Sequence, residues 1–158
     1  MTIRVSTGKS IALAAIACLL AGTAAAQEKR SVEYKVISTT DFIRFANPHP
    51  GERLRVEILM DKPDQARSIN GAFSAIPPGV PGVKVEYHYH QNRESIIQIL
   101  SGDAIEMING KAVPLKPGDV IYIAPGTRHA MINNSVINEV KYMEFYSPTA
   151  PDTVQVKD

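Results

Sequence analysis

The chain has 158 residues, a length typical of one globular domain. Its 17 Lys and Arg residues nearly balance its 16 Asp and Glu residues, so the formal net charge is only +1. This balance argues against a nucleic-acid footprint and against a polybasic membrane patch. It favours a small molecule as the partner.

Residues 1–26 have the three-part layout of a secretory signal peptide. Arg4 and Lys9 precede a ten-residue apolar run, and an Ala-rich stretch offers a cleavage site before Gln27. The run is too short to span a bilayer, so we predict a periplasmic or secreted protein with no membrane attachment after cleavage. The alternative is an N-terminal helix that belongs to the fold. The single cysteine, Cys18, lies in this segment, which leaves the remainder without a disulfide or a thiolate.

The rest of the chain has the pattern of an all-β sandwich or barrel, because many short apolar segments alternate with turn signals. A hairpin with a type I′ turn is predicted at Asn109-Gly110. The one helix-like segment is 64–68. The predicted strands are 35–38, 54–60, 71–76, 84–90, 95–100, 104–108, 111–114, 120–123, 129–132 and 139–146.

Three of the four histidines form a pattern that predicts a metal site. His88 and His90 lie two residues apart, so on an extended strand both imidazoles point to the same face. Glu94 follows after a short polar break, and His129 comes from a separate predicted strand. Three neutral imidazoles and one carboxylate suit Fe, Mn, Ni, Co or Zn better than Ca or Mg. The alternative is a set of ordinary surface or core histidines.

The two segments that carry these residues resemble the two sequence motifs of the cupin superfamily. The matching positions are Gly82, His88, His90 and Glu94 in the first motif, and Gly118, Pro125, Gly126, His129 and Asn133 in the second. The resemblance implies a double-stranded β-helix, or jelly-roll, barrel. It covers residues 71–152, preceded by N-terminal strands and an arm (27–70) and followed by a loose tail (153–158).

The match departs from the family pattern at two places. Pro125 directly precedes Gly126, whereas the family has one residue between them. Seven residues, not six, separate Glu94 from the turn glycine Gly102. A register shifted to Ser95 would place a serine, a poor ligand, at the fourth position, so we expect Glu94 to complete the ligand set.

Three further residues are candidates for the pocket. Glu86 shares the inward parity of His88 and can serve as a general acid or base, or it is a solvated carboxylate at the rim. Gln98 is predicted to point inward, where it bonds a ligand carboxylate or a substrate, or the barrel backbone. Met131 is predicted to line an apolar wall. Arg93, next to Glu94, is expected to point away from the metal.

The strand after Glu94 is apolar on both faces. We expect Ile96, Gln98 and Leu100 to face inward, with Ile97 and Ile99 on the outer face. Burial on both faces indicates a homodimer formed through the outer sheet.

The resemblance implies a metal-dependent enzyme that acts on a small oxygenated organic molecule. Fe or Mn and dioxygenation are the expected metal and reaction, with one divalent metal ion bound. The alternatives are a non-oxidative isomerase or lyase with Glu86 as its base, and a periplasmic protein that binds a ligand or metal without turnover. A fold of this kind is compatible with all three functions and does not distinguish them.

Overall fold

A computed structural model describes residues 34–49, 51–60, 66–79 and 85–156. The predicted signal peptide (1–26) lies outside these residues, so secretion stays a prediction. Within the described ranges, the structure contains no helix with the length and apolar character that a membrane crossing requires.

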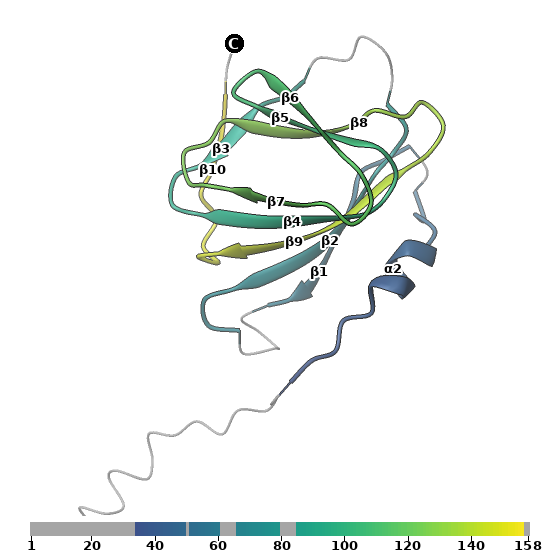
Figure 1. Cartoon of the computed structure of the whole chain (residues 1–158). Coiled ribbons are helices and arrows are strands. Elements are labelled where there is room, and N and C mark those ends of the chain that lie inside the picture. The colour runs from purple at the N-terminus through teal and green to yellow at the C-terminus, as the bar shows by residue number, and fades with distance from the viewer. Residues whose placement is uncertain (1–33, 50, 61–65, 80–84, 157–158) are drawn as a thin grey trace, which may run out of the picture. The chain divides into compact units, whose positions relative to one another are not determined.

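Among the described residues, ten strands form two five-stranded sheets, and every paired strand is antiparallel. The first sheet has the order β1 (Leu54–Leu59), β2 (Asn70–Ile76), β9 (Val140–Ser147), β4 (Glu94–Ser101), β7 (Val120–Ile123). The second has the order β10 (Thr153–Gln155), β3 (His88–His90), β8 (His129–Asn133), β5 (Ala104–Ile108), β6 (Lys111–Leu115). Figure 1 shows β5 and β8 facing β4 and β7 across the barrel. The predicted all-β jelly-roll barrel is confirmed.

The core between the sheets corrects the predicted parity of β4. Ile97 and Ile99 are buried against Tyr142. Ile96 and Gln98 are exposed on the outer face instead. The expected inward set was therefore wrong. The chain crosses from the second sheet to the first between His90 and Glu94, and a turn between sheets does not preserve the alternation of a continuous strand.

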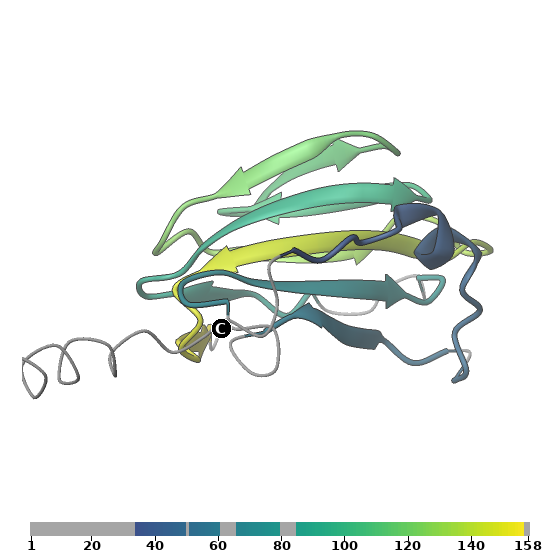
Figure 2. The same cartoon turned by 90° about the horizontal axis from the view of Figure 1, so that it is seen from below.

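A short helix, α2 (Thr39–Arg44), covers the outer face of the first sheet. Its Ser38 cap accepts a hydrogen bond from the Asp41 amide at 3.3 Å. The ring of Phe42 stacks on Phe73 with 4.5 Å between ring centroids. Figure 2 shows β9, in yellow, in the middle of the strands, with α2 lying against the sheet.

Four segments differ from the sequence prediction. Of the predicted strand 84–90, residues 85–87 form no strand, His88–His90 form β3, and residue 84 lies outside the described residues. No strand forms at 35–38, which leads into α2. The described part of the predicted helix at 64–68, residues 66–68, is not helical. The predicted loose tail contains β10, whose three residues pair with β3. Backbone pairing, rather than the apolar content of the segment, fixes that strand.

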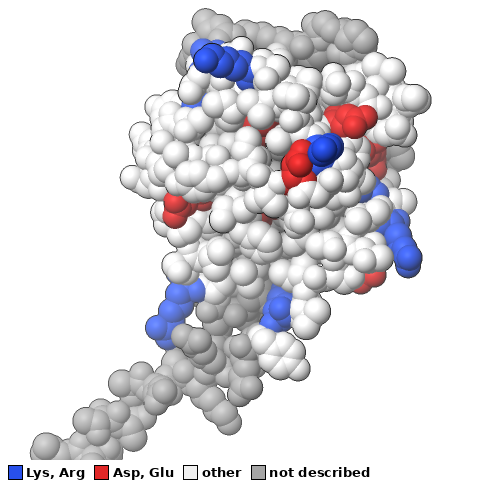
Figure 3. Space-filling view, viewed as in Figure 1, with Lys and Arg blue, Asp and Glu red and all other residues white. Residues whose placement is uncertain are grey.

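The outer face of β4 and β7 exposes large apolar side chains. Ile96 is 50%, Tyr122 56% and Val120 60% exposed. On the side of the molecule in Figure 3, charged residues of both signs are scattered and do not form a large patch of one sign. The predicted homodimer would form through this apolar face. The homodimer itself stays a prediction.

Two glycines with similar backbone conformations allow strain to be separated from steric overlap. Gly110 has φ +82° in the predicted type I′ hairpin, and a Cβ there meets nothing within 4 Å. Gly102 has φ +83°, but a Cβ there would overlap the carbonyl oxygen of Glu139. We expect Gly110→Ala to lower the free energy of unfolding by about 1 kcal/mol, and Gly102→Ala by about 3 kcal/mol. Urea unfolding measures both, and equal losses would contradict the steric argument.

Candidate metal centre

Three imidazoles converge at one end of the barrel. His88 and His90 come from β3, and His129 comes from β8, where it pairs directly with His88. One potential ligand atom from each side chain lies within 4.8 Å of the others. The ring centroids of His88 and His129 are 4.3 Å apart. Since metal–nitrogen bonds are about 2 Å long, these side chains can bind one ion after small adjustments.

The electrostatic environment keeps the three imidazoles neutral. Burial, and then the neighbouring His129 and His90, lower the pKa of His88 to about 4. Burial is also the main reason why the pKa values of His90 and His129 lie below the ordinary value. Neutral imidazole is the form that binds a metal, so the donor set fits a divalent transition ion.

Hydrogen bonds orient two of the rings. Nδ1 of His129 donates to the carbonyl oxygen of Thr127 at 2.8 Å, which leaves Nε2 available for a metal. Nδ1 of His90 lies 3.2 Å from Oδ1 of Asp152 and 2.7 Å from Nη2 of Arg93. Arg93 can only donate, so its contact requires an unprotonated Nδ1, whereas the contact with Asp152 requires a protonated one. A metal at Nε2 would place the proton on Nδ1 and so select donation to Asp152. Arg93 was expected to point away, but it contacts the ligand ring.

The structure does not bring Glu94 to the three histidines. Its side chain is exposed, and Oε2 accepts a hydrogen bond from the Tyr122 hydroxyl at 2.8 Å. Ser95, which is 2% exposed, occupies the inward position. The signal was present in the sequence. Six residues separate Ser95 from the turn glycine Gly102, and six is the spacing of the family pattern. The expectation that Glu94 completes the ligand set is corrected accordingly.

A carboxylate that the sequence analysis did not identify occupies the lumen beside Ser95. Glu144 of β9 is buried, accepts a hydrogen bond from Ser95 Oγ at 2.8 Å, and accepts another from Arg55 Nη1 at 2.9 Å. Burial alone would raise the pKa of Glu144, but the hydrogen bond and charge of Arg55 hold it below the ordinary value. Glu144 is therefore an anion, and it shares the Arg55 guanidinium with Glu57.

A second buried carboxyl group, that of Glu106 on β5, has a different state. It is 0% exposed, and neither oxygen has a hydrogen-bond partner among the described residues. Burial, and then the negative charge of Glu144, raise the pKa of Glu106 to about 8 against the opposing charge of Arg53. At neutral pH Glu106 is therefore mostly protonated.

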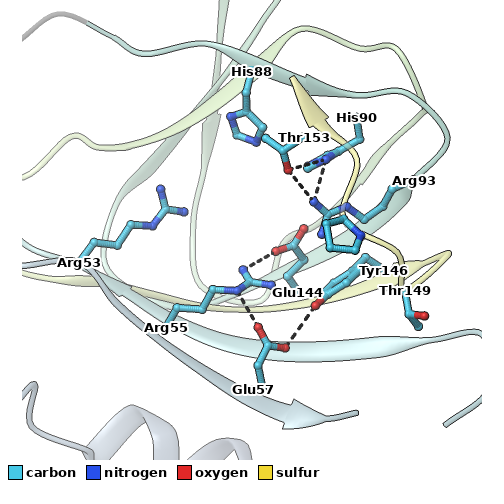
Figure 4. A pocket seen from close by; sticks show the side chains of 11 residues that line it. Arg53, Arg55, Glu57, His88, His90, Arg93, Glu144, Tyr146, Thr149 and Thr153 are labelled. Carbon is cyan, nitrogen blue, oxygen red and sulfur yellow. Dashed lines mark hydrogen bonds and ion pairs between the residues drawn. The ribbon is translucent and has the colours of Figure 1, made fainter. Parts of the chain in front are cut away.

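Two cavities share His88 in their lining. The smaller, about 440 Å³, is lined by His88, His90 and the arginines in Figure 4. The larger, about 600 Å³, is lined partly by Ile76, Pro77 and Met131. Arg53, His88 and Thr153 line both cavities.

The predicted pocket residues have different positions relative to these cavities. Met131 lines the larger cavity and packs against the core. Glu86 is exposed and also lines the larger cavity, whereas its role as a base stays a prediction. Gln98 lies on the outer face of β4, so its predicted contact with substrate is corrected for the same reason as the parity of that strand.

The corrected ligand set can be tested by metal content. We expect His88→Ala to lower metal affinity more than 100-fold, because the loss of a direct ligand exceeds the roughly 10- to 100-fold effect of an outer contact. Glu94→Gln and the distant control His49→Ala should retain the metal of the unmodified protein. Mass spectrometry of metals after competition with a chelator measures this. Loss of metal in Glu94→Gln would restore Glu94 as a ligand.

The protonated state of Glu106 predicts a pH-dependent stability. Below its unfolded pKa of 4.5, the group is protonated in both states. Between pH 4.5 and 8 only the unfolded chain ionises, so the unmodified protein loses stability relative to Glu106→Gln. Thermal unfolding of metal-free protein should show an advantage for Glu106→Gln that grows to on the order of 4 kcal/mol at pH 8. Glu94→Gln is the control, and a difference that does not vary with pH would contradict the assignment.

Comparisons with known proteins agree with this architecture. The family model "Cupin domain" matches residues 74–146. The oxalate-binding protein of Thermotoga maritima is 40% identical over 53 residues, which are 34% of this chain and 44% of that protein. The match therefore spans less than half the length of this curated relative.

Solved structures show the same fold. A conserved protein with a double-stranded β-helix domain from Klebsiella pneumoniae has a TM-score of 0.62 at 20% identity, covering 80% of this chain and all of that chain. A predicted oxalate decarboxylase from Thermotoga maritima has a TM-score of 0.53 at 26% identity, covering 62% of this chain and 82% of that chain. Because the family model and these structures match the strands that build the barrel, the chain belongs to the cupin superfamily.

Proposed function

We propose that this protein is a metal-dependent cupin enzyme that binds a small oxygenated organic molecule at a divalent transition metal. His88, His90 and His129 would hold the metal, and when bound it would supply Lewis acidity and positions for substrate and O₂. The observation that carries the proposal is the cluster of three neutral imidazoles, one of which, His88, lines two cavities.

The number of protein ligands favours catalysis over a structural role. Structural sites are closed by four protein ligands, whereas catalytic sites keep a position open. The described residues bring three ligands together, and Glu94 lies on the outer face. Both cavities reach His88, so a small molecule can approach the place where the open position would lie.

Dioxygenation with Fe or Mn is the reaction that we favour. Both atoms of O₂ enter the carbon product, so the reaction needs no external reductant and no second cofactor. The chain would bind the substrate, orient it and exclude water. Asp152 and Arg93 contact the Nδ1 side of His90 and so fix the orientation of this ligand ring.

A non-oxidative reaction is the second candidate. The partial similarity to an oxalate-binding protein and the structural likeness to a predicted oxalate decarboxylase support it. An isomerase or lyase needs a positioned acid or base, and Glu86 lies at the larger cavity beside His88. A secreted protein that captures a ligand without turnover is the third candidate.

Metal analysis and oxygen consumption distinguish these functions. We expect protein from its native compartment to contain Fe or Mn, and the loaded protein to consume O₂ and its oxygenated substrate in a 1:1 ratio, with β-diketones, polyphenols and 2-oxo acids as the compounds to be tried. His88→Ala should abolish turnover, and Glu86→Gln should leave it unchanged. An oxygen electrode and chromatography of the substrate measure both.

Other outcomes select the other candidates. If the substrate is consumed in the absence of O₂, and Glu86→Gln abolishes this consumption, dioxygenation is overturned in favour of an isomerase or lyase. Ligand binding without turnover for any metal would overturn an enzymatic role.

A further inference from the structure

The cations around the metal centre are not equally matched by anions. Arg55 pairs with Glu57 and Glu144, each at 2.9 Å. Arg93 lies 3.5 Å from Asp152. Figure 4 shows Arg55 joined by dashed lines to Glu57 and Glu144, and Arg53 standing apart from them.

Arg53 pairs with no carboxylate among the described residues. Its Nη2 donates to the hydroxyl of Tyr142, a neutral phenol that is itself buried. The two oxygens of Glu106 accept no hydrogen bond from it. The Arg53 residue precedes β1, is exposed to solvent, and reaches from there into the barrel. An uncompensated guanidinium at the lumen thus remains accessible from outside.

The expected metal adds to this positive charge. Three neutral imidazoles contribute no negative charge, so a divalent ion that they hold keeps its formal charge of +2. Had Glu94 been a ligand, one negative charge would have been supplied by the protein. The charge balance of the site therefore calls for an anionic substrate.

We infer that Arg53 is the carboxylate anchor of the substrate site, and that the substrate is a carboxylate with a neighbouring carbonyl or hydroxyl oxygen. The planar guanidinium matches a carboxylate through two parallel hydrogen bonds. The neighbouring oxygen would then face the histidines, since Arg53 and His88 line the same cavities. This inference rests on the proposed function and narrows its substrate class.

The larger cavity indicates where the rest of the molecule lies. Apolar side chains, among them Ile76, Pro77, Val85 and Met131, form much of its lining. Its volume of about 600 Å³ exceeds what a two-carbon acid fills. The carbon body of the substrate is therefore placed there, with the carboxylate at Arg53.

A matched pair of probes tests the anchor. Benzoylformate carries a carboxylate beside a carbonyl, and 1-phenylpropane-1,2-dione replaces that carboxylate with a neutral acetyl group. Calorimetry on Co²⁺-loaded protein measures affinity, and the visible Co²⁺ spectrum reports on contact with the metal. We expect Arg53→Gln to lower the affinity for benzoylformate at least 10-fold and to leave the affinity for the dione unchanged. Arg53→Lys should recover part of the loss, and the exposed Arg44→Gln in α2 should behave like the unmodified protein.

The cavity is tested with glyoxylate, which lacks the ring. Benzoylformate should bind at least several-fold more tightly than glyoxylate, because the ring is removed from water. Equal affinities would overturn the placement of the carbon body.

The results separate the anchor from the proposed function. If benzoylformate binds the unmodified protein and Arg53→Gln equally, or binds neither, the carboxylate anchor is overturned. If it binds through Arg53 without changing the Co²⁺ spectrum, the anchor holds and direct coordination of substrate fails. Equal Co²⁺ content in all variants shows that the metal site is intact.

Discussion

The carboxylate of Asp152 holds the ligand-bearing end of the barrel in one arrangement. Strand β3 has three residues, and its register includes one pair with β8 and three with β10. Asp152 directly precedes β10, and its Oδ2 accepts hydrogen bonds from the amides of Asn92 and Arg93, both at 2.8 Å. Its Oδ1 faces His90. One side chain therefore fixes both a ligand ring and the turn by which the chain changes sheets.

The lumen next to this anchor is organised by compensation of charge. Glu144 is stabilised as an anion by Arg55 and Ser95, whereas Glu106 has no partner and is kept neutral by burial. These two carboxyl groups show how strongly the surroundings, rather than the residue type, set the charge inside the barrel. Arg53 differs from both, because it keeps its charge and pairs with no carboxylate among the described residues.

The sequence predicted the barrel and three ligands because these depend on local signals. Turns such as Asn109-Gly110 separate apolar strands, and His88 and His90 share a face on any extended strand. The orientation of Glu94 could not be obtained by counting, since the alternation is interrupted where the chain changes sheets. Glu144 was missed because both faces of β9 are buried, so no pattern marks the side that faces the lumen. β10 was missed because its few residues are held by β3, a partner far away in the sequence.

That distant partner has a consequence for how the centre assembles. Thr153 and His90 are separated by 63 positions, and closing so long a loop delays the pairing relative to local hairpins such as β5–β6. During synthesis, the segment containing His88 and His90 leaves the ribosome well before Asp152 and β10 are available. The ligand geometry is thus completed late, together with the first sheet, whose central strand β9 ends five residues before β10 begins. A nascent chain has two of its histidines in place before it has the strand that aligns them.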